Sequence, residues 1–170
     1  MAEREISREK DRQASALNHY EAVMSLLEEK RERATSGRIV IRRSTLDWQQ
    51  NRQGKVGYYM VEAISDTALT DWRVFAHEIH THSGKHTHQG GIVLYVTKGR
   101  GYTVVNGVKK EWKAGDMVLL PVLPGGVEHQ HWSLDPDTPS EWVAFRYIPW
   151  MSATGSQFTQ RETSPNWQQP

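Results

Sequence analysis

Residues 86–101 read HTHQGGIVLYVTKGRG, and residues 115–131 read GDMVLLPVLPGGVEHQH. Each stretch contains a short run of β-prone residues bounded by glycine-containing turns, which is typical of closely spaced strands. The first stretch begins with His86 and His88, and the second ends with His129 and another histidine two positions later. Side chains of a strand alternate between its faces, so histidines two residues apart project to the same side. The two stretches therefore predict a β-rich domain with paired histidines on its strand faces.

Three of these histidines are candidate ligands of one metal ion. The imidazoles of His86 and His88 would lie about 6–7 Å apart along a strand, close enough to bind a single ion from adjacent positions. His129 is the best candidate for the third ligand, because the second stretch predicts a strand, a long turn and a returning strand. His131 competes for this role because it faces the same way. The chain has eight histidines and no cysteine, so a metal would be bound through nitrogen and oxygen.

The rest of the chain predicts an all-β domain with an extension at each end. Strands are expected at 38–42, 58–64, 74–79, 84–88, 92–98, 101–106, 117–121, 129–134 and 141–148, with a hairpin turn at Asn106-Gly107. Apolar residues at helical spacing predict a helix over residues 4–33, and Gly37 follows it as a stop. So many short strands at close spacing favour a sandwich or barrel. We therefore expect a helical extension at 1–37, a β-barrel at 38–150 and a polar tail at 151–170.

Composition narrows the classes of function and of partner. Acidic and basic residues nearly balance, with a formal net charge of +1, which gives no reason to expect nucleic acid as a partner. No apolar run approaches the ~18 residues that a membrane span needs. Residues 1–11 are charged, unlike a signal peptide, so a cytoplasmic location is expected. The helical and polar extensions are compatible with a homo-oligomer, a dimer or larger, and also with a hetero-oligomer.

The two histidine-bearing stretches resemble the two conserved motifs of the cupin superfamily. The first cupin motif has H-x-H, a glutamate four residues on and a Tyr-Val-x-x-Gly ending. The second has Gly-Asp, an apolar run, Pro, a short loop and His. The segment from His88 to Gly99 fits this spacing, whereas the alternative pair His80 and His82 lies too far from Gly99. The resemblance covers residues 80–148 and implies an all-β cupin fold, a double-stranded β-helix or jelly-roll barrel, with the N-terminal helix added to it.

Two departures from the cupin pattern bear on the chemistry. Ile92 occupies the position of the usual glutamate ligand, and the loop before His129 is longer than usual. Gentisate 1,2-dioxygenase and its relatives, which cleave hydroxylated aromatic acids, also lack this glutamate and bind Fe(II) through three histidines. Residues 102–107 and 129–131 resemble the equivalent stretches of those enzymes. The resemblance therefore implies a single-cupin relative with Fe(II) at its three histidines, with Mn, Ni and Zn as alternatives.

Three neutral imidazoles leave a divalent ion its full charge and about three open positions. Such a site suits a chelating, anionic small molecule together with O2, as a non-haem iron ring-cleaving dioxygenase requires. His131 is the candidate catalytic residue, because it can donate to the substrate or move a proton. The candidate substrate contacts are Tyr102 on a strand pointing across the barrel, Arg146 as a carboxylate partner, Ile92 beside the metal and His82 at the cavity mouth.

Two other classes of function remain open. The same metal could act as a Lewis acid in an isomerase, a lyase or a decarboxylase. The chain could also be a non-catalytic ligand-binding protein or the small subunit of a two-component dioxygenase. Hydrolysis at zinc is disfavoured, because no pair of carboxylates is placed to act as general base.

Overall fold

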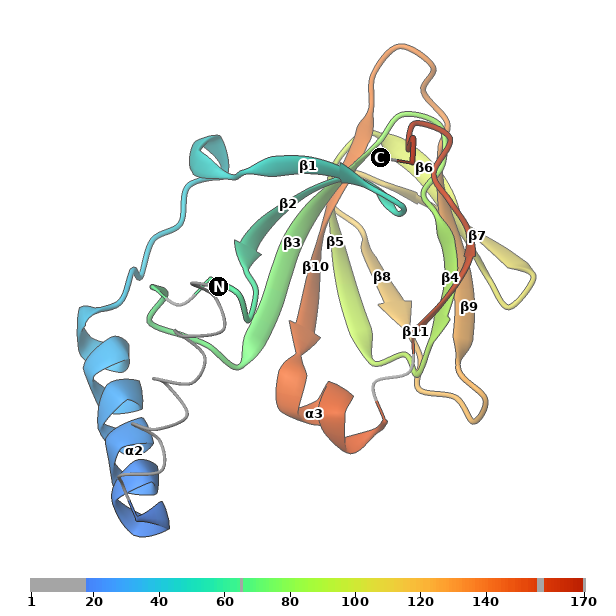
Figure 1. The fold of residues 1–170 in the computed structure, drawn as a ribbon. Coiled ribbons are helices and arrows are strands. Elements are labelled where there is room, and N and C mark those ends of the chain that lie inside the picture. Colours follow the sequence, from blue (N-terminus) through green and yellow to red (C-terminus); the bar gives the residue numbers. More distant parts are fainter. Residues whose placement is uncertain (1–17, 65, 156–157, 170) are drawn as a thin grey trace. The chain divides into compact units, whose positions relative to one another are not determined.

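Two β-sheets dominate the part of the chain that the structure describes, namely residues 18–64, 66–155 and 158–169 of this computed structural model (Figure 1). In chain order the strands are β1 (Trp48–Asn51), β2 (Gly54–Met60), β3 (Trp72–Ile79), β4 (Lys85–His88), β5 (Ile92–Lys98), β6 (Arg100–Val105), β7 (Val108–Lys113), β8 (Met117–Leu120), β9 (Val127–Ser133), β10 (Ser140–Tyr147) and β11 (Phe158–Glu162), and a 3-10 turn, η1 (Arg43–Thr45), precedes them. One sheet has the order β1-β2-β3-β10-β5-β8 and the other β11-β4-β9-β6-β7. All neighbouring strands are antiparallel. The predicted all-β fold class is therefore confirmed.

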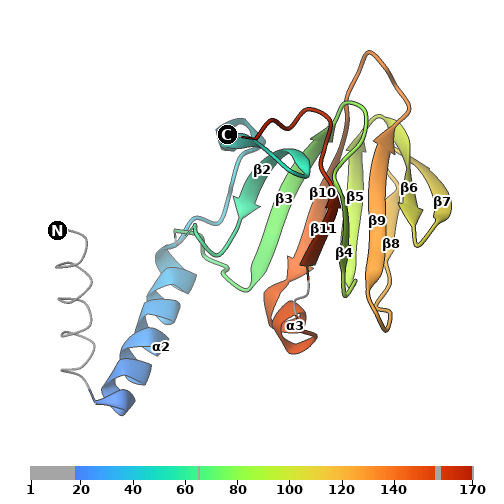
Figure 2. The same ribbon diagram turned by 45° about the vertical axis from the view of Figure 1, so that its right-hand side comes forward.

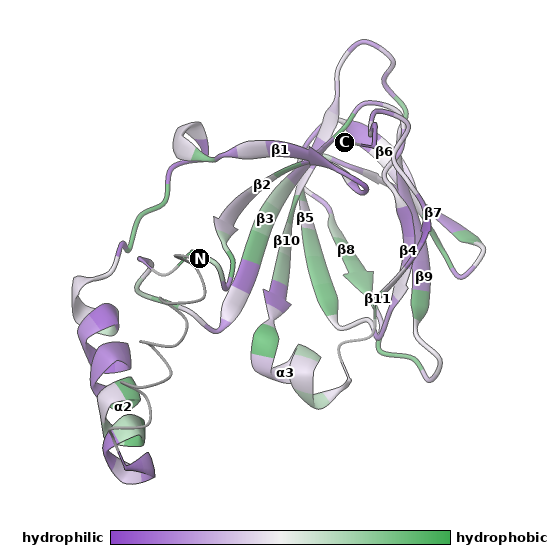
Figure 3. Cartoon of the chain, viewed as in Figure 1, coloured by the Kyte–Doolittle hydropathy of each residue, from purple (hydrophilic) through white to green (hydrophobic). Residues whose placement is uncertain are grey.

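The six-stranded sheet supplies most of the apolar core. On β5 the side chains of Ile92, Leu94 and Val96 are buried, while those of Val93 and Tyr95 between them are exposed. A strand with one face on the core produces this alternation. Figure 3 shows β5 and β8 as largely hydrophobic and β4 as hydrophilic. The apolar core therefore comes mainly from the six-stranded sheet.

The hairpin between β6 and β7 turns at the predicted Asn106-Gly107 pair. Both residues have a positive φ, 46° for Asn106 and 82° for Gly107. A two-residue hairpin turn of type I′ needs this conformation at both positions, so the predicted turn is confirmed. Strand β7 itself was not predicted, because all of its residues except Trp112 are exposed and its sequence shows no apolar alternation.

The C-terminal segment folds into the domain instead of forming the expected polar tail at 151–170. Strand β10 continues into the short helix α3 (Ile148–Ala153), and β11 then pairs with β4 as an edge strand (Figure 2). Further on, the Ser164 N–H donates to the Arg52 carbonyl oxygen at 2.8 Å. The sequence of β11 did not reveal a strand, because most of its side chains are exposed and polar, as is common at a sheet edge.

Of the described residues, 18–39 and Asp66–Leu69 belong to a compact unit distinct from the one that contains both sheets. Helix α2 (His19–Ser36) belongs to this unit. Its N-terminus is capped by Asn18, whose side chain accepts a hydrogen bond from the Glu21 N–H at 3.0 Å. A helix in this region was predicted, and the cap explains where the described helix begins.

The structure bears on two of the predicted elements in this region. The helix predicted over 4–33 is described from residue 19 onward, and residues 4–17 lie outside the described part of the chain. No strand forms at 38–42, where Arg38 makes an isolated bridge with Thr67 instead. No helix among the described residues is long and apolar enough to cross a membrane.

Candidate metal centre

Pairing of β4 with β9 brings the three predicted ligands together. His86 lies directly opposite His129 in the antiparallel ladder, and His88 follows two residues along β4. The ring centroids are 4.1 Å apart for His86 and His129, 4.7 Å for His88 and His129, and 5.4 Å for His86 and His88. One ring nitrogen of each residue lies within 4.8 Å of the other two. Because metal–nitrogen bonds are about 2 Å long, small side-chain rotations suffice to enclose one ion.

The protein holds all three candidate ligands as neutral imidazoles. Burial lowers the pKa of His86 to about 2, that of His88 to about 3 and that of His129 to about 4. For His86 and His88 the proximity of His129 adds to this effect. Only an unprotonated ring nitrogen has the lone pair that a metal needs. The cluster is therefore in the protonation state for cation binding at neutral pH.

The ring environments fit a bound cation, with one adjustment at His88. Nδ1 of His129 donates to the Val127 carbonyl oxygen at 3.3 Å, which leaves the lone pair of Nε2 free. Nε2 of His88 is buried and has no hydrogen-bond partner among the described residues, which is unusual for a buried polar atom. The Gly90 N–H donates to Nδ1 of His88 at 2.8 Å. A metal held through Nε2 would require the ring proton on Nδ1, so this backbone contact would have to open.

The histidine cluster forms part of the wall of a cavity of about 360 Å³ lined by both sheets. Aromatic and aliphatic side chains, among them Phe75, Leu94 and Trp142, make up much of the remaining wall. None of the described residues that line the cavity is Asp or Glu. Two arginines, Arg73 and Arg146, do line it. The size suits a small molecule, and the charge of the wall favours an anion.

Three further residues predicted for the site also line this cavity, namely Ile92, His131 and Arg146. His131 lies on the same face of β9 as His129, and its Nδ1 is 2.8 Å from the Thr103 hydroxyl. That hydroxyl accepts a hydrogen bond from Nε1–H of Trp112 at 2.9 Å. Its own proton is then available to Nδ1, which places the imidazole proton of His131 on Nε2. A buried chain of hydrogen bonds thus sets the tautomer of His131.

Tyr102 and His82 lie outside the cavity. The Tyr102 ring stacks on Trp132 with centroids 5.8 Å apart and an interplanar angle of 7°. Its neighbour Thr103 faces inward, so the two-residue period of the strand turns Tyr102 outward, and the predicted orientation across the barrel is wrong. The His82 ring also contacts Trp132, at 4.4 Å. Both residues pack around this indole and not around the candidate metal centre.

Among the cavity residues that were not identified from the sequence, three have side chains that bear on its chemistry. Phe158 of β11, in the supposed tail, has its ring 4.8 Å from that of His86. His77 of β3 is buried and lines the cavity, and burial lowers its pKa to about 4. Arg73 lies on the same strand, four residues earlier. The two-residue period along β3 was a signal for these last two, because positions 73, 75 and 77 share one face.

Residues 74–146 match the cupin domain family. The fold is similar to that of a cupin-like protein from Thermotoga maritima, with 19% identity and a TM-score of 0.52 over 76% of this chain and 92% of that chain. It is also similar to a conserved protein with a double-stranded β-helix domain from Klebsiella pneumoniae, with 18% identity and a TM-score of 0.53 over 74% and 99% of the two chains.

Salicylate 1,2-dioxygenase from Pseudaminobacter salicylatoxidans has 20% identity and a TM-score of 0.50 over 62% of this chain, but the match spans only 29% of the dioxygenase. A search of curated proteins found no match. These likenesses are evidence about architecture. The two antiparallel sheets and the family match over residues 74–146 together show that this chain has the cupin fold.

Proposed function

We propose that the protein is a metal-dependent cupin enzyme, a non-haem Fe(II) dioxygenase acting on a hydroxylated aromatic acid or a similar chelating small molecule. The observation that carries the proposal is a cluster of three neutral imidazoles on a cavity wall to which the described residues contribute no carboxylate. Ile92 lines the cavity. It occupies the position at which a glutamate ligand would otherwise offset part of the charge of the metal. A divalent ion held in this way keeps its full charge, which favours ionised, chelating oxygens. The salicylate dioxygenase is a precedent for dioxygenase chemistry on this fold.

The residues of the cavity have distinct roles under this proposal. His86, His88 and His129 would hold Fe(II), which would supply the redox chemistry and the positions for substrate and O2. His131 presents Nε2–H and can donate to, or exchange a proton with, a substrate hydroxyl. Ile92 keeps the surroundings of the ion apolar, which restricts the access of water.

Metal analysis and oxygen uptake test the proposal. Protein reconstituted anaerobically with Fe(II) should hold close to one iron per chain and consume O2 with a member of a panel comprising gentisate, salicylate, catechol, hydroquinone and β-diketones. His129→Ala should lose both properties. His80→Ala should lose neither, because His80 is half-exposed and contacts Glu78 outside the cavity.

Two results would contradict the proposal in different ways. Turnover of a substrate without O2 would instead favour an isomerase, lyase or decarboxylase with the same metal. An iron content far below one per chain that excess Fe(II) does not restore would favour a ligand-binding protein or the subunit of a two-component enzyme.

A further inference from the structure

The ladder between β3 and β10 brings together two pairs of like charges. Glu78 lies directly opposite Glu141, and Arg73 lies directly opposite Arg146. Like charges opposite one another on neighbouring strands are destabilising unless other groups neutralise them. The alternation of side chains separates the two pairs, because the arginines line the cavity and the glutamates do not. Each pair therefore needs counter-ions on its own side of the sheet.

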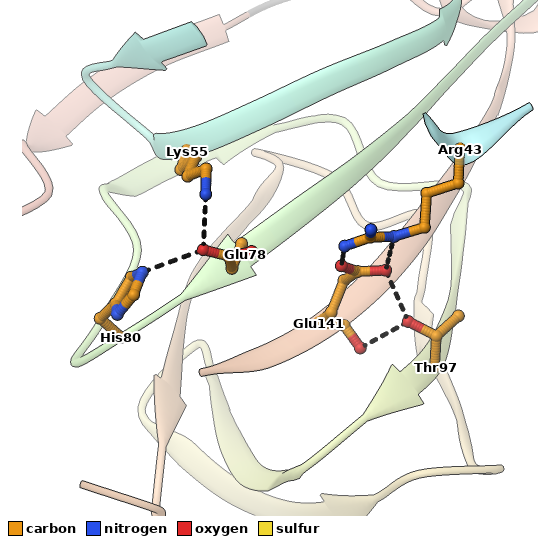
Figure 4. Close-up of polar contacts among 6 residues, drawn as sticks. All are labelled: Arg43, Lys55, Glu78, His80, Thr97 and Glu141. Carbon is orange, nitrogen blue, oxygen red and sulfur yellow. Dashed lines mark hydrogen bonds and ion pairs between the residues drawn. The ribbon is translucent and has the colours of Figure 1, made fainter. Parts of the chain in front are cut away.

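The glutamate pair has its counter-ions within the chain. Glu78 accepts from Nζ of Lys55 at 2.9 Å and lies 3.0 Å from Nε2 of His80. Glu141 is paired with the guanidinium of Arg43, whose Nε–H donates to Oε1 at 3.1 Å. Figure 4 shows both carboxylates facing these partners. The chain thus neutralises two opposed acids with nearby basic groups.

The arginine pair is only partly compensated by the described residues. Arg73 is paired with Glu62, whose carboxylate accepts from Nε–H at 2.9 Å. Nε of Arg146 is buried without a hydrogen-bond partner, and its Nη2 lies 4.0 Å from the sulfur of Met151. Burial, reinforced by Arg73, lowers the pKa of Arg146 to about 10, so the group is still charged at neutral pH. A partly buried positive charge therefore faces the cavity with no hydrogen-bonded carboxylate among the described residues, and Glu62 acts on it only at longer range.

We propose that Arg146 and Arg73 form a carboxylate-binding site, and that the counter-ion of Arg146 is the carboxylate of a small aromatic acid. A guanidinium binds a carboxylate through two parallel hydrogen bonds, and such charge-assisted pairs are stronger than neutral ones. The adjoining wall is aromatic: the Phe75 ring lies 5.6 Å from that of Tyr58 and 5.9 Å from that of Trp142. Both the charge and the aromatic surface are thus present in one cavity.

The carboxylate site and the histidine cluster act on the same cavity. The charge of Arg146 contributes to the lowered pKa values of His86, His88 and His129, which places it within electrostatic range of all three. A further consequence rests on the proposed function. A hydroxylated aromatic acid would bind Arg146 through its carboxylate and direct its hydroxyl oxygens toward the three histidines.

Benzoate binding to the metal-free full-length protein, measured by titration calorimetry, tests the carboxylate site without iron or O2. We expect benzoate to bind and its neutral isostere benzamide to bind at least about tenfold more weakly, because a charge-assisted pair is replaced by a neutral contact. Arg146→Met should weaken benzoate binding by a similar factor. Arg146→Lys keeps the charge but loses the planar fork, so its binding should be intermediate.

Glu62→Gln provides a test in the opposite direction. It releases Arg73 from its ion pair, so benzoate should bind more tightly than to the unmodified protein. Asp66→Asn is the matched control, because Asp66 forms an exposed ion pair with Arg38 that does not line the cavity. This control should leave the affinity unchanged.

Three results would overturn the inference: no benzoate binding, equal binding of benzamide, or wild-type affinity in a folded Arg146→Met protein. If Arg146→Met does not fold, wild-type affinity in Arg146→Lys together with no gain in Glu62→Gln overturns it as well. Because the protein is metal-free, these outcomes are independent of the iron and oxygen tests. A carboxylate site can thus survive the failure of the dioxygenase proposal, and the reverse also holds.

Discussion

Replacement of Arg146 by methionine should stabilise the ligand-free protein while weakening its binding of carboxylates. Burial and the charge of Arg73 lower the pKa of Arg146 from 12.5 to about 10. A pKa displacement of this size corresponds to roughly 3 kcal/mol against the charged form. Methionine retains the apolar stem of the side chain, so part of the packing remains. We therefore expect the free energy of unfolding to rise by about 1–3 kcal/mol.

Urea unfolding monitored by tryptophan fluorescence and far-UV circular dichroism provides the measurement. The midpoint should move to higher urea with an unchanged slope, because the surface exposed on unfolding is the same. The melting temperature should rise by about 2–4 °C per kcal/mol for a chain of this length.

Arg43→Met is the matched comparison within the same domain. Arg43 pairs with Glu141, whose side chain is only 7% exposed. Loss of this arginine leaves a buried carboxylate without its cation, so stability should fall by roughly 1–3 kcal/mol. A loss of stability in Arg146→Met as large as that in Arg43→Met would refute the reasoning. It would show that the folded protein already neutralises Arg146.

Further expectations concern protonation, the buried hydrogen bonds and the metal. The pKa of His77 falls from 6.5 to about 4 on folding, so the folded state binds fewer protons. The free energy of unfolding should therefore decline as the pH falls from 6.5 toward 4, and His77 should contribute about 1.4 kcal/mol of this decline per pH unit. Urea unfolding at a series of pH values should show a shallower decline for His77→Gln. Thr103→Val leaves Nδ1 of His131 and an indole N–H buried without a shared hydroxyl, and should cost about 2 kcal/mol of unfolding free energy. Fe(II) at about 100 times its Kd should raise the unfolding free energy by about 2.7 kcal/mol in calorimetry, with EDTA reversing the shift and His129→Ala showing none.

Much of the fold was predictable because its signals are local. The strand at 92–98 was predicted with the bounds that β5 has in the structure, because a β-prone run there is bounded on both sides by glycine turns. The hairpin at Asn106-Gly107 was predictable because few residue pairs tolerate a positive φ at both positions. In contrast, β7 and β11 were not predicted, because exposed edge strands need no apolar face.

The candidate site was only partly predictable from the sequence. The alternation rule placed His86 and His88 on one face, and the structure brings His129 opposite His86. The same rule predicts that Tyr102 faces outward only if Thr103 is known to face inward, and the sequence did not reveal the orientation of Thr103. Which face of a strand is the inner one depends on the partners it acquires, and the local pattern did not reveal this for a strand with polar residues on both faces.

The sequence by itself determined a β-rich cupin domain and the set of histidines that could bind a metal, because turn chemistry, apolar alternation and ligand spacing are properties of short segments. Only the tertiary structure decided that Phe158 contacts His86 and that Arg73 lies opposite Arg146. Both contacts join residues more than 70 positions apart, and they form only when distant strands adopt one register. Other long-range contacts provide counter-ions for Glu78 and Glu141, whereas Arg146 has no hydrogen-bonded carboxylate in the described part of the chain. The charge of the cavity, and with it the kind of ligand it favours, is therefore a property of the assembled sheets.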